Sequence, residues 1–218
     1  MAQNLLDGPD EFGGNNGDTL TTYSANWVLL ATDGNALFIR GTPGVGATSN
    51  SAQELRNGFT WTNDQWAELK IDGTTLADAR FLVGVRCTVG DHTTCTGYWG
   101  GVHRNMTGGT YEIYKFAGTG DPTQLATSAV SYAVNDVVNF EAVGTTLNLL
   151  VNGSLASTVT DATYATGSPA MMLGATNNNR LGGTWKAGSV GAAGRTTKNT
   201  RTNPLGVELG MNLWGTLD

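Results

Sequence analysis

The chain has 218 residues, of which 39% are hydrophobic and only 14% charged, and it contains 31 glycines and six tryptophans. This hydrophobic content excludes a disordered chain, and the length suits one all-β domain with an extension. The formal net charge of −6 argues against non-specific binding of the whole molecule to nucleic acid.

Most of the chain predicts short β-strands separated by turns rich in Gly, Asn and Asp, with no helix longer than about one turn. We expect residues 10–27 to form an edge strand and a turn-rich segment. Residues 27–30 and 36–40 predict a hairpin that turns at 32–35, and a glycine-rich loop follows at 41–50. Further strands are predicted at 65–71, 80–88, 97–104, 111–116, 137–143 and 147–151, within 161–173, and at 181–190.

The C-terminal segment differs from the rest of the chain. It is rich in Gly, Thr and Asn, and its basic residues Arg195, Lys198 and Arg201 follow a mostly acidic body. Alternating apolar residues then predict a strand with one apolar face, which at a terminus becomes ordered only against another surface. These apolar residues are Leu205, Val207, Leu209, Met211 and Leu213, followed by Trp214. We expect a β-sandwich over 1–190 and an assembly arm over 191–218, which docks on its own body or, in the interpretation we favour, on a neighbouring subunit.

The sharpest pattern lies between Tyr111 and Gly153, with the phrases YEIYKF, VVNFEAVG and LVNG. The phrases VGVR and GYW precede it, and TDATYATGSPAMML follows. Together they resemble the concanavalin A-like superfamily, with its laminin G-type and glucanase-type jelly rolls, over residues 10–190. The resemblance implies an all-β, concanavalin A-like jelly-roll β-sandwich of two antiparallel sheets, extended here by the C-terminal arm. Folds of this kind carry unrelated functions, so the resemblance implies an architecture and not an activity.

Glycosidic cleavage needs two carboxyl groups that flank the scissile bond. In the glucanases of this superfamily both come from one strand of the form Glu-x-Asp-x-x-Glu, and this chain has no such run. Glu112 and Glu141 could still meet across neighbouring strands, or could be two solvated or ion-paired glutamates. His92 and His103 lie outside any nucleophile motif, and we expect a surface role for both. We therefore predict a non-enzymatic protein without catalytic residues, and a divergent glycoside hydrolase remains the weakest alternative.

The superfamily often binds a saccharide on one sheet, through aromatic rings and polar side chains. If the apolar residues of the strands point into the core, alternation directs the others outward. Trp99 and Tyr114 would then stack on a sugar. The complete predicted glycan face is Arg86, Trp99, His103, Glu112, Tyr114, Asn139, Glu141 and Asn148. An ordinary half-polar sheet face is the alternative interpretation.

Some members of the superfamily also bind calcium through loop carboxylates and carbonyls. Asp33, Asp72 and Asp161 lie in suitable turns, but their spacing fits no calcium loop, so we predict no cofactor and no metal. Cys87 and Cys95 flank a short polar segment, and both a disulfide and two reduced thiols remain open.

The N-terminus lacks the basic and apolar regions of a secretion signal, and no apolar run is long enough to span a membrane. A lectin-like sandwich without a signal, without glucanase chemistry and with an assembly arm is typical of a bacteriophage virion. Our leading hypothesis is a virion surface protein, a capsid decoration or fibre-type component made in the host cytoplasm. Its partners would be a capsid or tail protein, further copies of itself and surface glycans. A free-standing carbohydrate-binding module or lectin is the alternative.

Overall fold

The computed structural model describes residues 2–29, 36–40, 44–47, 52–72, 79–89, 94–105, 108–118, 122–175 and 180–191. The predicted C-terminal arm lies outside the described residues except for Gly191, the last residue of β15, and His92 and Asp33 also lie outside them. The arm residues concerned are Arg195, Lys198, Arg201, Leu205, Val207, Leu209, Met211, Leu213 and Trp214.

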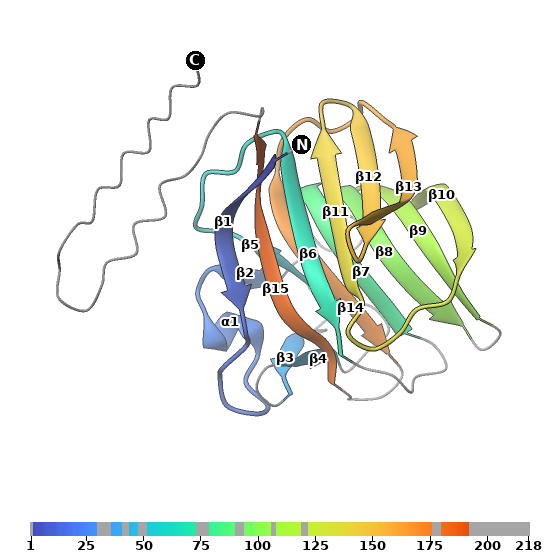
Figure 1. Ribbon diagram of the computed structural model, residues 1–218. Helices are drawn as coiled ribbons and strands as arrows, with labels where there is room; N and C mark the ends of the chain where they lie inside the picture. Colours follow the sequence, from blue (N-terminus) through green and yellow to red (C-terminus); the bar gives the residue numbers. More distant parts are fainter. Residues whose placement is uncertain are drawn as a thin grey trace, which may run out of the picture.

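Two antiparallel sheets pack face to face, as Figure 1 shows. Within the described residues, sheet A has eight strands. In order of pairing they are β13 (Ser154–Thr160), β12 (Thr146–Val151), β11 (Val137–Val143), β6 (Gln65–Ile71), β15 (Arg180–Gly191), β4 (Val45–Ala47) and β3 (Leu37–Ile39), with β1 (Ala2–Asp10) also paired to β15. The predicted two-sheet jelly-roll β-sandwich is confirmed.

Sheet B has seven strands within the described residues. In order of pairing they are β10 (Thr123–Val130), β9 (Gly108–Ala117), β8 (Thr96–Asn105), β7 (Ala79–Cys87), β14 (Ser168–Ala175), β5 (Ala52–Arg56) and β2 (Trp27–Leu29). The helix α1 (Leu20–Tyr23) is one turn long. In the part of the chain that the structure describes, no helix has the length and apolar character needed to cross a membrane.

The core follows from the alternation of apolar residues along the central strands. Val138, Phe140 and Ala142 of β11 point inward and are fully buried, and they face the inward residues of β7. Trp27 of sheet B and Trp185 of sheet A meet edge to face, with ring centroids 4.9 Å apart. Burial of this apolar surface between the sheets is the main source of stability.

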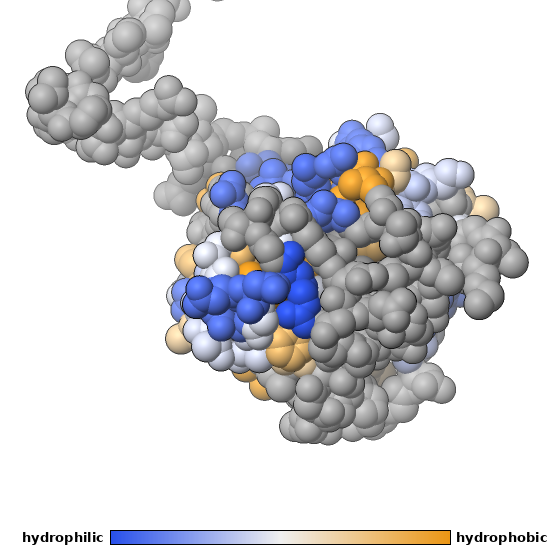
Figure 2. All heavy atoms as spheres, turned by 90° about the horizontal axis from the view of Figure 1, so that it is seen from below, coloured by the Kyte–Doolittle hydropathy of each residue, from blue (hydrophilic) through white to orange (hydrophobic). Residues whose placement is uncertain are grey.

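The described residues on the surface at one end of the sandwich are largely hydrophilic (Figure 2). Figure 2 views the molecule from the end at which α1 and β3 lie in Figure 1. Most described residues on this end are hydrophilic, and hydrophobic ones form only small, separate patches. The described part of this end therefore offers no broad apolar docking surface.

The hairpin predicted at 27–40 is wrong. β2 pairs with β5 in sheet B, whereas β3 pairs with β4 in sheet A. The two segments therefore belong to opposite layers of the sandwich, because long-range pairing partners outweigh their closeness in sequence. The predicted glycine-rich loop at 41–50 likewise contains a strand, β4.

Candidate functional site

The structure divides the predicted glycan face between the two sheets. One group lies on the outer surface of sheet B, on β8 and β9, and another lies on the outer surface of sheet A, on β11 and β12. Figure 1 shows these two pairs of strands in opposite layers. The first group is Trp99, His103, Glu112 and Tyr114, and the second is Asn139, Glu141 and Asn148. The two outer surfaces point away from each other, because the sheets pack together through their inner faces. These residues therefore do not form a single face.

Trp99 is not exposed on sheet B. Its side chain is fully buried in a second hydrophobic cluster, where its ring lies edge to face with Phe116 at a centroid distance of 6.0 Å. Cys87 and Cys95 belong to the same cluster, and burial raises the pKa of the Cys87 thiol well above its ordinary value. A buried ring cannot stack on a sugar, so the role predicted for Trp99 is not supported by its position.

Glu112 is the centre of a polar network on the outer surface of sheet B. Glu112 is 6% exposed, and its carboxylate accepts hydrogen bonds from the hydroxyls of Thr110 and Tyr114, both at 2.8 Å. His103 Nδ1 lies 3.5 Å from the same carboxylate. Burial, reinforced by Glu112, raises the pKa of Tyr114 to about 12. Both oxygens of the Glu112 carboxylate therefore already accept hydrogen bonds from protein groups.

Arg86 lies at the end of β7 with a positive φ of 56° and is 2% exposed. Its guanidinium donates to the carbonyl oxygens of Asn63 at 2.8 Å and Tyr164 at 3.0 Å, and it lies 3.5 Å from Asp64. Burial lowers the pKa of Arg86, and the charge of Asp64 opposes that shift. Arg86 therefore holds two connecting segments together and is not a residue of an open face.

The sheet A group forms a cross-strand ladder. Glu141 accepts hydrogen bonds from Gln3 at 3.1 Å and from Asn148 at 3.0 Å, while Asn139 donates to Glu68 at 3.1 Å. These bonds link β1, β6, β11 and β12 and fix the position of the N-terminal strand. Glu112 and Glu141 project from opposite faces of the sandwich, so this pair cannot flank one glycosidic bond.

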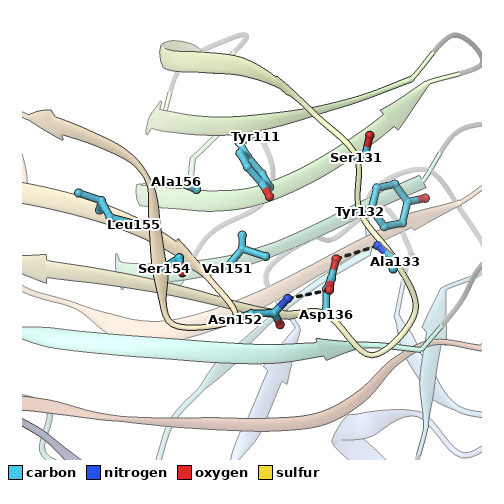
Figure 3. Close-up of a pocket in the computed structure, with 10 residues that line it drawn as sticks. All are labelled: Tyr111, Ser131, Tyr132, Ala133, Asp136, Val151, Asn152, Ser154, Leu155 and Ala156. Atoms are coloured by element: carbon cyan, nitrogen blue, oxygen red, sulfur yellow. Dashed lines mark hydrogen bonds between the residues drawn. The ribbon is translucent and has the colours of Figure 1, made fainter.

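A groove with a volume of about 550 Å³ lies between β9 of sheet B and the β12–β13 hairpin of sheet A. The β10–β11 connection forms its third wall. Figure 3 shows the ten lining residues, which are Tyr111, Ser131, Tyr132, Ala133, Asp136, Val151, Asn152, Ser154, Leu155 and Ala156. Both sheets and two turns thus contribute side chains to one concave surface.

The hairpin turn fixes the polar part of the groove. Asn152 and Gly153 both have positive φ, 51° and 77°, as a two-residue turn between twisted strands requires. The Asn152 side chain accepts the N–H of Val137 at 2.9 Å and donates to one oxygen of Asp136 at 2.8 Å. The other oxygen of Asp136 accepts the N–H of Ala133 at 2.7 Å. These two hydrogen bonds hold the Asp136 carboxylate rigidly. Because each carboxylate oxygen can accept two hydrogen bonds, Asp136 can still accept further hydrogen bonds from a ligand.

Aromatic and aliphatic side chains form the remainder of the groove. Tyr111 is half-buried and directs its hydroxyl toward the side of the groove where Val151 and Asp136 lie (Figure 3). Burial raises the pKa of Tyr111, and the charge of Asp136 adds to this, so the hydroxyl keeps its proton at neutral pH. Tyr132 packs against Phe81 with ring centroids 5.8 Å apart. The groove combines apolar surface with a fixed acceptor.

The sequence did not predict this groove. Asp136 and Asn152 are 16 positions apart, and only the pairing of Val137 with the end of β12 brings them together. The Asn-Gly turn was a visible signal for the hairpin but not for a site. Tyr111 shares the inward face of β9 with Ile113 and packs against the core, so alternation does not mark it as part of a groove.

The described residues contain no group of three or more His, Cys, Asp or Glu side chains that could hold a metal ion. Asp161, one of the predicted turn carboxylates, instead bonds to Lys115 and Tyr98 at 2.8 and 2.6 Å. Burial would raise the pKa of Asp161, but hydrogen bonds from Lys115, Thr163 and Tyr98 outweigh it and hold the pKa well below its usual range. Asp161 does not fit a calcium site, because its carboxylate oxygens already accept hydrogen bonds from protein groups.

No family model matches the sequence, and no curated protein matches it either. Solved structures do match the fold. A carbohydrate-binding module from Bacillus subtilis has a TM-score of 0.53 and 14% identity, covering 75% of this chain and 96% of its own. The exoplasmic/lumenal domain of VIP36, in a form bound to Ca²⁺ and Man3GlcNAc, has a TM-score of 0.56 and 11% identity, covering 79% and 88%.

A Bacillus subtilis protein with a galectin-like fold also matches, with a TM-score of 0.54 and 8% identity, covering 76% of this chain and 90% of its own. These likenesses support the concanavalin A-like sandwich that the sequence resemblance implied. At such identities they establish the fold alone, and any function must be argued from the residues of this chain.

Proposed function

We propose that the protein is a non-enzymatic carbohydrate-binding β-sandwich whose ligand lies in the groove of Tyr111, Asp136 and Asn152, and that it serves on the surface of a bacteriophage virion. The groove carries the first part of the proposal. It joins an aromatic side chain, apolar surface and a rigidly held acceptor within about 550 Å³. Sugars offer apolar C–H faces and hydroxyl groups, which such a surface can contact together.

The structural neighbours favour the same class of ligand. They include a carbohydrate-binding module and a lumenal domain bound to a mannose-containing glycan. The shared fold supports a saccharide as the class of ligand, but it does not indicate where on this chain the saccharide binds. The placement in the groove is argued from the residues of this chain.

A glycan array followed by titration calorimetry tests the groove. We expect Tyr111→Ala and Asp136→Ala each to weaken binding of the best glycan by at least about tenfold, since they remove aromatic contact area and a rigidly held hydrogen-bond acceptor. Tyr114→Ala is the matched control, because Tyr114 is a half-buried tyrosine on the outer surface of sheet B. Loss of binding in the control but not in the groove variants would move the site to sheet B. The bound glycan should also show no new reducing ends after incubation.

The virion role is supported by the sequence of the predicted arm, with its alternating apolar residues after a basic stretch. Such an arm suits docking on a capsid or tail protein or on another copy of this chain. Co-sedimentation of the full-length chain with particles of the virus that encodes it tests the role. We expect the full-length chain, but not a chain truncated after Gly191, to sediment with the particles. A monomeric full-length chain that never sediments with them would refute the virion role and leave the groove untouched.

A further inference from the structure

We infer that the groove between β9 and the β12–β13 hairpin selects neutral saccharides and rejects acidic ones such as uronates. The inference rests on the proposed carbohydrate-binding function and adds the chemical class of the ligand. It follows from the charges and hydrogen-bonding groups that line the groove.

Asp136 is the one charged residue among the ten described residues that line the groove, and no Lys, Arg or His stands beside it there. Its two oxygens are held by a backbone N–H and by the amide of Asn152, which are neutral donors. These donors orient the carboxylate without cancelling its charge. The groove therefore presents a negative potential, in a molecule with a formal net charge of −6.

A carboxylate on the ligand would meet this charge at close range. Like charges brought together at an interface suppress the wrong partner, and screening by solvent in an open groove leaves an effect of about tenfold in affinity. The hydrogen-bonding groups act in the same direction. An ionised uronate group and the Asp136 carboxylate both only accept hydrogen bonds, so they cannot bond to each other. A neutral sugar instead brings hydroxyl groups that donate hydrogen bonds to Asp136.

Tyr111 adds a hydrogen-bond donor to the groove. Its hydroxyl keeps the proton, so it can donate to a ring or hydroxyl oxygen while Asp136 accepts from a neighbouring hydroxyl. Leu155, which is 61% exposed at the rim, and Val151 add apolar surface and no charge. The preference for a neutral ligand over an anionic one thus comes from Asp136, while Tyr111 and the apolar side chains add contacts without adding charge.

The test compares matched pairs by calorimetry: methyl glucoside with methyl glucuronide, and methyl galactoside with methyl galacturonide. We expect the neutral member of a binding pair to bind at least about tenfold more tightly at low salt. Asp136→Asn should narrow the ratio to within about threefold, mainly by improving binding of the uronide. Glu141→Gln removes a carboxylate from the outer surface of sheet A and should leave the ratio unchanged.

A second measurement uses the wild-type protein alone. Raising the salt concentration screens repulsion, so uronide binding should improve while binding of the neutral glycoside stays constant. Uronides that bind as tightly as the neutral glycosides, with the same salt dependence, would overturn the inference and leave the carbohydrate-binding function standing. Failure of all four glycosides and of a broad glycan array would instead overturn the proposed function itself.

Discussion

Glu54 offers a sharp test of the core because it is a carboxyl group buried within the sandwich. It lies on β5, is fully buried, and accepts the backbone N–H of Leu37 at 3.0 Å through one oxygen. The other oxygen has no hydrogen-bond partner among the described residues. Burial raises the pKa of Glu54 from 4.5 to about 8, and the bond from Leu37 opposes this rise. The folded protein therefore keeps this proton at neutral pH.

The magnitude follows from linkage between protonation and folding. Because the folded-state pKa is raised, the stabilisation is complete below pH 4.5 and is lost as the pH rises through about 8. Each pKa unit corresponds to about 1.4 kcal/mol, so the free energy of unfolding should fall by about 5 kcal/mol across this window from Glu54 alone. Glu54→Gln keeps the acceptor for Leu37 but cannot ionise, so this part of the pH dependence should vanish.

Urea denaturation of the wild type and Glu54→Gln between pH 5 and pH 9, roughly the span of the shift, measures the effect. We expect the variant to gain stability relative to the wild type as the pH rises, because other titrating groups cancel in the difference. Glu11→Gln, at an exposed glutamate, is the control and should show no such trend. A difference that stays flat within about 1 kcal/mol would show that Glu54 ionises normally in the folded state, and the reasoning from burial would fail.

Two further substitutions test the packing within sheet B and its contact with the segment that follows β13. Gly101→Ala should lower the free energy of unfolding by about 1–3 kcal/mol, because its Cβ would overlap the carbonyl oxygen of Phe81. Gly13→Ala, where no atom lies within 4 Å of the new Cβ, should change it by less than about 0.5 kcal/mol in the same denaturation experiment. Lys115→Met should destabilise the protein by about 1 kcal/mol at pH 6, because it removes the 2.8 Å ion pair with Asp161. Because the pKa of Asp161 is depressed, this loss should shrink as the pH falls below 3.8, and a loss that is constant down to acid pH would contradict the assignment.

Local sequence patterns were sufficient for the strands at the centre of each sheet. Residues 137–143 were expected as a strand, and β11 is Val137–Val143, with Val138, Phe140 and Ala142 pointing inward as the alternation indicates. Alternation identifies this strand because one of its faces is buried and every second side chain points to the same face. Apolar residues at every second position therefore indicate which face is buried. The short strands β4 and β5 carry too few residues for such a pattern and were not predicted.

The candidate site could not be obtained in the same way. Alternation assigned Glu112 and Glu141 correctly to outward positions, but it is identical for strands of either sheet, so it could not show that they face opposite directions. Trp99 is outward by the same rule and yet is fully buried, since burial depends on what covers a strand and not on the strand itself.

The sequence by itself determined that this chain forms a turn-rich, two-layered β-sandwich, because alternating apolar residues must bury one face and glycine and asparagine must turn the chain. Only the tertiary structure decided which strands share a sheet and which polar residues meet. Asp136 joins Asn152 because two turns come together at the end of β11 and β12, and Tyr111 joins them from the opposite sheet. The groove is a product of that long-range pairing, whose partners local sequence patterns do not specify.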